Sequence, residues 1–137
     1  MLVAMERRTR TAAQRIGDAG ERHVSRRLEA LGWTILARNL RVGRDEIDLL
    51  AVDPAGPGAL VVVEVRRRGR RDFGLAEETL DRRKRTALRR AIGTLLERGS
   101  LPDGRPLPRL PLRVDLVALD VAPDGRESMR HHRAIAP

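Results

Sequence analysis

The sequence predicts an α/β domain, because it alternates long amphipathic segments with short apolar runs. Two segments carry apolar residues every three or four positions, which is the periodicity of a helix with one buried face. The short runs are rich in Val, Ile and Leu and are bounded by Gly, Pro, Asn and Asp, as is typical of strands and turns. The predicted elements are a helix at 12–31, strands at 33–39, 45–50 and 60–68, a helix at 75–98 and a strand at 112–121.

The chain is short and strongly basic, and both properties restrict its class. Its 137 residues suffice for one domain with its own core. A net charge of +9 favours nucleic acid or another polyanion as the partner, although a solvated basic surface has the same composition. The absence of cysteine excludes disulfides, thiolate metal sites and cysteine nucleophiles. No apolar run approaches the roughly 18 residues of a membrane span or resembles the core of a signal peptide, so we expect a cytoplasmic protein without membrane contact.

The domain boundaries follow from the ends of the periodic segments. Residues 1–11 are rich in arginine and show no apolar periodicity, which predicts a disordered basic arm. Such an arm could contact phosphates, or it could simply be a frayed terminus. Residues 12–122 are predicted to form the single α/β domain, and residues 123–137 a tail or an edge strand.

The hairpin predicted at 45–68 carries acidic side chains where a purely structural strand would have none. Asp48 interrupts one apolar run, and Glu64 ends the most apolar run of the chain. If Val52 pairs with Leu60, Asp48 directly faces Glu64, with Cβ atoms about 4.5–5.5 Å apart. Facing carboxylates repel and need a shared proton or a cation, for which Mg²⁺ (or Mn²⁺) is the natural candidate. A register shifted by one residue would put the two acids on opposite faces.

Further charged residues near this hairpin each allow two interpretations. Glu21 borders the apolar stripe of the first helix, either as a partner of the helix dipole or as a third acid aimed at the sheet. Lys84, the only lysine among 28 basic residues, lies on the apolar side of the second helix. It either snorkels to solvent or points at the carboxylates. The arginines after Glu64 form a solvated edge or a phosphate contact. These arginines are Arg66, Arg67, Arg68, Arg70 and Arg71.

No site is assigned to the C-terminal part of the chain. Alternation along 112–121 places Arg113 and Asp115 on the exposed side of the last predicted strand. His131 and His132 could ligate a metal, but they lack a partner histidine at metal-site spacing.

Several short motifs occur in order over about residues 15–120 and carry a family resemblance. The motifs are Gly17-Asp18-Ala19-Gly20-Glu21, Arg38-Asn39-Leu40-Arg41, Glu46-Ile47-Asp48-Leu49-Leu50, Val63-Glu64-Val65-Arg66-Arg67-Arg68, Phe73-Gly74 with Lys84 downstream, and Arg113-Val114-Asp115. Together they resemble the YraN family of small bacterial proteins. Asp48 followed by Glu64-Val65-Arg66, with Glu21 on a preceding helix, is similar to the PD-(D/E)XK arrangement of restriction-endonuclease-like nucleases.

The resemblance implies a restriction-endonuclease-like core, with a central mixed β-sheet flanked by α-helices. It implies a Mg²⁺-dependent endonuclease or phosphodiesterase acting on DNA, including branched or repair intermediates. Asp48, Glu64 and the Val65 carbonyl would be metal ligands, joined by Glu21 directly or through water, and the arginines 67–71 would hold the nucleic-acid backbone. Similar arrangements occur in Holliday-junction resolvases, which are often dimers, so a homodimer is one expectation.

Two residues depart from the family pattern. Asp45 stands where the family usually has Gly, and it adds local negative charge. Arg66 stands where the nuclease motif has a lysine that is thought to orient or activate the attacking water and to steady charge on phosphorus. Arginine can stabilise the charge but does not deprotonate in proteins. Either Arg66 acts electrostatically, or Lys84 reaches into the vacated position, or the site has lost catalysis.

Two other functions fit the same sequence. The chain could be a nucleic-acid-binding protein with a degenerate, non-catalytic nuclease fold. Alternatively, the acids could be structural and merely paired to arginines such as Arg66 and Arg113.

Overall fold

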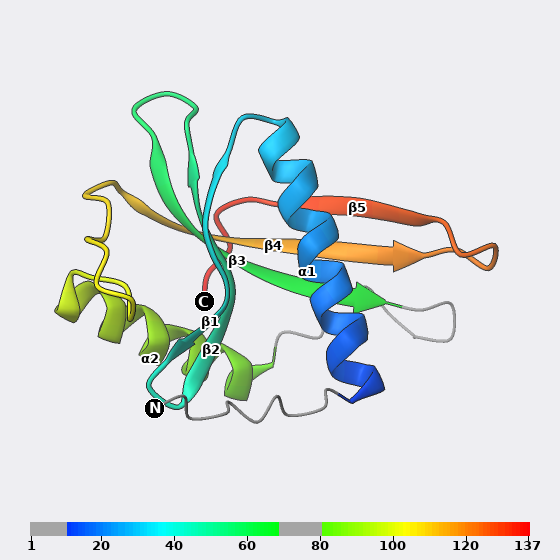
Figure 1. The fold of residues 1–137 in the computed structure, drawn as a ribbon, viewed down its shortest axis with the longest axis horizontal. Helices are drawn as coiled ribbons and strands as arrows, with labels where there is room; N and C mark the ends of the chain where they lie inside the picture. Colours follow the sequence, from blue (N-terminus) through cyan, green and yellow to red (C-terminus); the bar gives the residue numbers. More distant parts are fainter. Residues whose placement is uncertain (1–10, 69–80) are drawn as a thin grey trace, which may run out of the picture.

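The structure is a computed structural model that describes residues 11–68 and 81–137. These residues form two helices and five strands (Figure 1). The elements are α1 (Ala12–Ala30), β1 (Thr34–Val42), β2 (Asp45–Asp53), β3 (Ala59–Arg68), α2 (Arg82–Arg98), β4 (Leu112–Val121) and β5 (Glu127–His132).

The five strands form one mixed sheet in the order β1-β2-β3-β4-β5. Neighbouring strands are antiparallel except β3 and β4, which are parallel. A parallel pair needs a long crossover connection, and α2 lies in that connection. The result is a mixed sheet flanked by helices, which confirms the predicted fold class and is consistent with a restriction-endonuclease-like core.

The helices cover opposite faces of the sheet, and each encloses its own apolar cluster. Val24 and Leu28 of α1 pack with β3 residues such as Val61, while Leu88 of α2 packs on the other face with residues such as Val62. Successive side chains of a strand point to opposite faces, so a strand covered on both sides must be apolar throughout. This explains the uninterrupted apolar run at the start of β3.

The second helix is shorter within the described residues than the sequence predicts. It begins at Arg82 and not at residue 75, because Asp81 is extended and caps it, accepting a hydrogen bond from the Lys84 N–H at 2.9 Å. Aspartate at this position satisfies a backbone donor that the first helical turn leaves free. Residues 75–80 lie outside the described residues. Neither helix in the described ranges is long and apolar enough to cross a membrane.

The strand predictions hold with small changes at the ends. β1 continues past residue 39, because Arg41 pairs with Glu46 and Val42 with Asp45 around a tight turn. β4 has the predicted bounds, and residues of the tail form β5 at the edge of the sheet.

A close approach of α1 to the sheet determines where its side chains can reach. A Cβ atom on Gly20 would lie 3.3 Å from Cδ1 of Leu119 in β4, which is closer than ordinary van der Waals contact. The absence of a side chain at Gly20 therefore lets the helix pack close to the sheet, which accounts for a glycine within a helix. The next residue in α1 is Glu21, which this approach brings down to the strands.

Candidate metal centre

The β2–β3 hairpin has the predicted register, but its ladder ends before the two acids. Val52 pairs with Leu60, and the pairing continues to Leu49 and Val63. Beyond that pair, Asp48 Oδ2 accepts a hydrogen bond from the backbone N–H of Val65 at 2.8 Å. Asp48 and Glu64 are therefore not a ladder pair, contrary to the prediction. A carboxylate that accepts a backbone N–H avoids the repulsion that direct pairing would impose.

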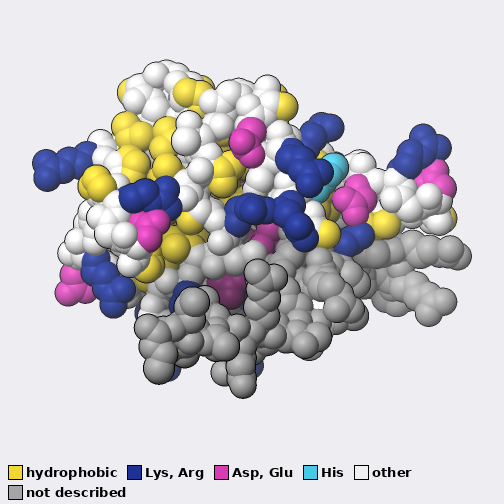
Figure 2. Space-filling model, in the orientation of Figure 1, with side chains coloured by type: hydrophobic (Ala, Val, Ile, Leu, Met, Phe, Trp, Pro, Cys, Tyr) yellow, Lys and Arg dark blue, Asp and Glu magenta, His cyan; other side chains and the backbone are white. Residues whose placement is uncertain are grey.

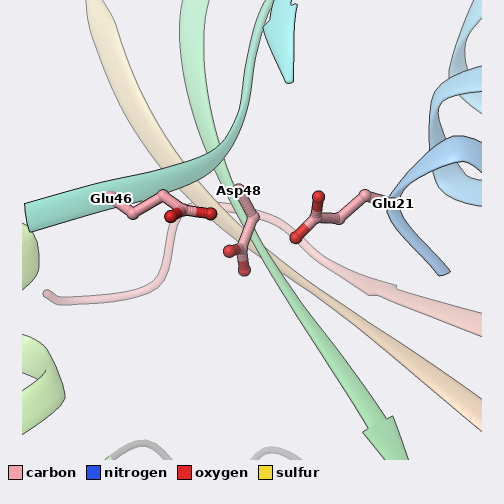
Figure 3. Close-up of side chains that lie close together, drawn as sticks. All are labelled: Glu21, Glu46 and Asp48. Atoms are coloured by element: carbon pink, nitrogen blue, oxygen red, sulfur yellow. The ribbon is translucent and has the colours of Figure 1, made fainter. Parts of the chain in front are cut away.

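Asp48 instead belongs to a cluster of three carboxylates, here called the carboxylate cluster. Its members are Glu21 from α1 and Glu46 and Asp48 from β2, each with an oxygen within 4.8 Å of the others. Figure 3 shows Glu46 and Glu21 reaching toward Asp48 from opposite sides. Glu46 was not among the site residues predicted from the sequence. The pattern that indicates it is the spacing of Glu46 and Asp48, because side chains two apart on a strand share a face.

Glu21 is the buried member of the carboxylate cluster. It is 8% exposed, and its Oε2 has no hydrogen-bond partner among the described residues. Burial, followed by the charges of Asp48 and Glu46, raises the pKa of Glu21 to about 8, although a hydrogen bond with Asn39 acts in the opposite direction. Glu21 lies far from the start of α1 at Ala12, so it is aimed at the sheet and does not interact with the helix dipole.

Glu64 lies beside the carboxylate cluster and is held by two cations. It is 1% exposed, and its Oε1 lies 3.1 Å from Lys84 Nζ and 3.6 Å from a guanidinium nitrogen of Arg66. Lys84 therefore points at a carboxylate and does not snorkel. Burial and the charge of Asp48 raise the pKa of Glu64 to about 7, while Lys84 and Arg66 lower it. The Oε2 atom of Glu64 has no hydrogen-bond partner among the described residues.

The extra negative charge of Asp45 is neutralised locally. Arg90 of α2 donates two hydrogen bonds to Asp45, at 2.7 and 2.8 Å. These hydrogen bonds, opposed by burial, lower the pKa of Asp45. Asp45, which stands where the family usually has Gly, is therefore neutralised by a residue of α2.

Most of the arginine cluster predicted to contact nucleic acid lies outside the described residues. Arg67 donates to Glu127 of β5 at 2.7 Å. Arg70, Arg71 and the side chain of Arg68 lie outside the described residues. Phosphate contact by Arg67–Arg71 stays a prediction.

A second ionic group, which was not predicted from the sequence, surrounds Asp115 in β4. Asp115 is 0% exposed, whereas alternation predicted it on the exposed side. It accepts hydrogen bonds from Arg113 at 2.8 and 2.9 Å and from the Ala134 N–H at 3.0 Å, and His131 Nε2 lies 2.8 Å from Oδ2. The prediction failed because β4 is a central strand whose two faces are both covered. Arg113 also pairs with Asp53, at 2.9 Å.

The carboxylate cluster has the donor set of a divalent-cation site. Oxygen ligands from carboxylates are those that Mg²⁺ and Mn²⁺ prefer. Three carboxylates this close repel unless a proton or a cation lies between them. The unpartnered Oε2 atom of Glu21, a member of the carboxylate cluster, supplies a buried oxygen that such a cation would satisfy.

Comparison with known proteins identifies the family. The family model described as uncharacterised protein family UPF0102 matches residues 20–119. A UPF0102 protein of Symbiobacterium thermophilum is 39% identical over 83% of this chain and 89% of its own. One from Roseiflexus castenholzii is 36% identical over 86% and 89%, and one from Kineococcus radiotolerans is 38% identical over 88% and 92%.

One solved structure is similar at a lower level. SfsA of Pyrococcus furiosus, in complex with Ca²⁺, aligns over 85% of this chain and 62% of its own, with a TM-score of 0.37 and 17% identity. A likeness of this degree carries no argument about function. The matches to the family, which cover most of the chain, confirm the resemblance seen in the motifs. The chain therefore belongs to the uncharacterised protein family UPF0102, the YraN family.

Proposed function

We propose that the protein is a divalent-cation-dependent phosphodiesterase that acts on DNA. The observation that supports this most strongly is the carboxylate cluster, in which Glu21, Glu46 and Asp48 from two elements converge within 4.8 Å. The cluster lies beside the ion pair of buried Glu64 and half-buried Lys84, in a chain of net charge +9. Carboxylates that hold a cation, next to fixed positive charge, are the parts that phosphodiester hydrolysis requires.

The carboxylates would hold the cation with Glu64 as a further ligand. Glu21, Glu46 and Asp48 would supply one oxygen each, and Glu64 would supply its unpartnered Oε2. The Val65 N–H orients Asp48 through the 2.8 Å hydrogen bond. A bound Mg²⁺ or Mn²⁺ would lower the pKa of water and neutralise charge on the phosphate oxygens.

Lys84 and Arg66 would stabilise the charge that develops on the phosphate group. Glu64 holds the Lys84 ammonium group at 3.1 Å, so the cation is already positioned beside the carboxylates. A pre-positioned cation stabilises a transition state without the cost of reorganisation. Arg66 adds donors suited to phosphate oxygens but cannot act as a base. Lys84 from α2 is thus the residue we place in the role of the missing motif lysine.

A second candidate is a nucleic-acid-binding protein that does not cut. One observation favours it: Glu64 Oε1 already faces both Lys84 and Arg66, so the two cations are partly neutralised before any substrate binds. This candidate predicts DNA binding with a steep salt dependence and without a cation requirement.

Cleavage assays with an Asp48→Asn variant distinguish the two functions. Asparagine keeps an oxygen that can accept the Val65 N–H but removes the charge, so we expect a folded protein whose cation-dependent cleavage falls about 100-fold or more. Labelled single-stranded, flapped and branched DNA would be incubated with Mg²⁺, Mn²⁺ or EDTA.

The matched control is Asp124→Asn, which removes an aspartate in an exposed turn. It should cleave as the wild type does. Cation-independent cleavage, or equal cleavage by both variants, would refute the phosphodiesterase. Binding without cleavage of any substrate would support the second candidate.

A further inference from the structure

A groove between α1 and β1 carries three arginines that the candidate metal centre does not use. It has a volume of about 400 Å³, and we call it the arginine groove. Figure 2 shows Lys and Arg side chains gathered over α1 and β1 on this face of the molecule. The residues that line the groove are Arg22, Ser25, Arg26 and Glu29 of α1 and Ile35 and Arg38 of β1.

The charge of the arginine groove is suited to an anion. Three arginines and a single acid, Glu29, line it. Arg26 and Arg38 are exposed, and neither forms an ion pair with any described residue. By contrast, Arg90, Arg113 and Arg130 each lie against an aspartate. Arg26 and Arg38 therefore carry charge that the described part of the chain leaves available.

Residues of the arginine groove are direct neighbours of residues of the carboxylate cluster. Arg22 follows Glu21 in α1. On β1, Arg38 pairs with Leu49, the residue after Asp48. Residues that pair across an antiparallel ladder share a face, and Leu49 belongs to the apolar cluster under α1. Arg38 thus lies on the face of the sheet that α1 covers, and its pairing partner Leu49 directly follows Asp48.

We propose that the arginine groove binds the phosphate backbone of the single DNA strand that enters the carboxylate cluster. Arg26 of α1 and Arg38 of β1 line the groove from its two sides, so both can contact one backbone. A groove of about 400 Å³ has the size of a site for one or two nucleotides of a single strand. Contacts of this kind position a strand without reading its sequence. That the strand leads to a cleavage site rests on the proposed function, whereas the binding itself does not.

The test removes two arginines from the groove and two from elsewhere. Arg26→Gln/Arg38→Gln would be compared with Arg98→Gln/Arg109→Gln, exposed arginines at the end of α2 and in the loop after it. Both variants lose two positive charges, so only position differs between them. Binding of a fluorescein-labelled single strand of mixed sequence would be followed by anisotropy in EDTA over a series of salt concentrations, with circular dichroism to verify folding.

The groove variant should bind about tenfold more weakly than the wild type. Its slope of log affinity against log salt should be shallower by about 1.4, the contribution of two phosphate contacts to a single strand. The control variant should stay within about twofold of the wild type, because its charges act only at long range.

Several outcomes would overturn the proposal: wild-type protein that does not bind, groove and control variants that weaken equally, or a larger effect of the groove variant on duplex DNA. Failure of the proposed function gives a different result. Wild-type protein that binds through the groove but never cleaves with Mg²⁺ or Mn²⁺ would remove the phosphodiesterase and leave the binding site in place.

Discussion

Replacing Glu21 with glutamine is expected to stabilise the cation-free protein and to remove its thermal response to Mg²⁺. Burial and the charges of Asp48 and Glu46 raise the pKa of Glu21 from 4.5 to about 8. A carboxyl whose pKa is raised by folding reduces stability increasingly as pH rises from its unfolded pKa toward its folded pKa. At pH 7.5 the variant should therefore gain about 1–3 kcal/mol in the free energy of unfolding.

Thermal unfolding with and without cation measures both parts of this prediction. A cation that binds only the folded state, at about 100 times its Kd, stabilises by about 2.7 kcal/mol. Wild-type protein should show this rise in Tm, and Glu21→Gln should not. Glu97→Gln, which changes an exposed acid of α2, serves as the control and should respond like wild type. A Glu21→Gln protein that is less stable than wild type without cation, or that keeps the full response, would contradict the account.

Asp115→Asn is expected to cause the largest loss of stability, about 3–5 kcal/mol. Asp115 is fully buried and is held by Arg113, His131 and the Ala134 N–H, all within 3.0 Å. Asparagine removes the charge that balances Arg113 and cannot accept all of these hydrogen bonds. Urea unfolding measures the change, with Asp103→Asn as the control in an exposed loop. A loss below about 1 kcal/mol, the size expected of a surface pair, would show that the group is not a buried ionic centre.

The same aspartate predicts a pH dependence in the acid range. Burial alone would raise the pKa of Asp115, but hydrogen bonds from His131, Arg113 and Ala134 outweigh it and hold the pKa at about 2. A lowered pKa gives stability that is fully present above the unfolded value of 3.8 and is lost as pH falls toward 2. Wild type should therefore lose about 2 kcal/mol more than Asp115→Asn between pH 5 and 2. Parallel losses in the two proteins would argue against this assignment.

The sequence predicted the order and type of the elements, because these depend on local patterns. The Pro/Gly turn and the two apolar runs allow more than one register, and the structure has the one in which Val52 pairs with Leu60. The sequence did not decide whether the Lys84 side chain extends to solvent or points at the carboxylates. A helix pattern shows that a side chain borders the apolar stripe, but only packing against β3 shows that it reaches Glu64.

The spacing of Glu46 and Asp48 puts both on one face, but whether Glu46 or Glu64 joins Asp48 could not be predicted, because it depends on where the ladder stops. Regular pairing would place Asp48 beside Glu64, whereas the Val65 N–H binds the Asp48 carboxylate and the site gathers Glu46 instead. No pattern along the sequence predicts the arginine groove either. Its residues come from α1 and β1, and their proximity arises from packing of the helix on the sheet.

The central claim, that the carboxylate cluster binds a divalent cation, is tested most directly by calorimetric titration with Mn²⁺. Wild type and Asp124→Asn should each bind Mn²⁺ with the same affinity at one site. Asp48→Asn should show no measurable binding, because it removes the charge at the centre of the cluster. Mn²⁺ binding by Asp48→Asn with wild-type affinity would contradict the account.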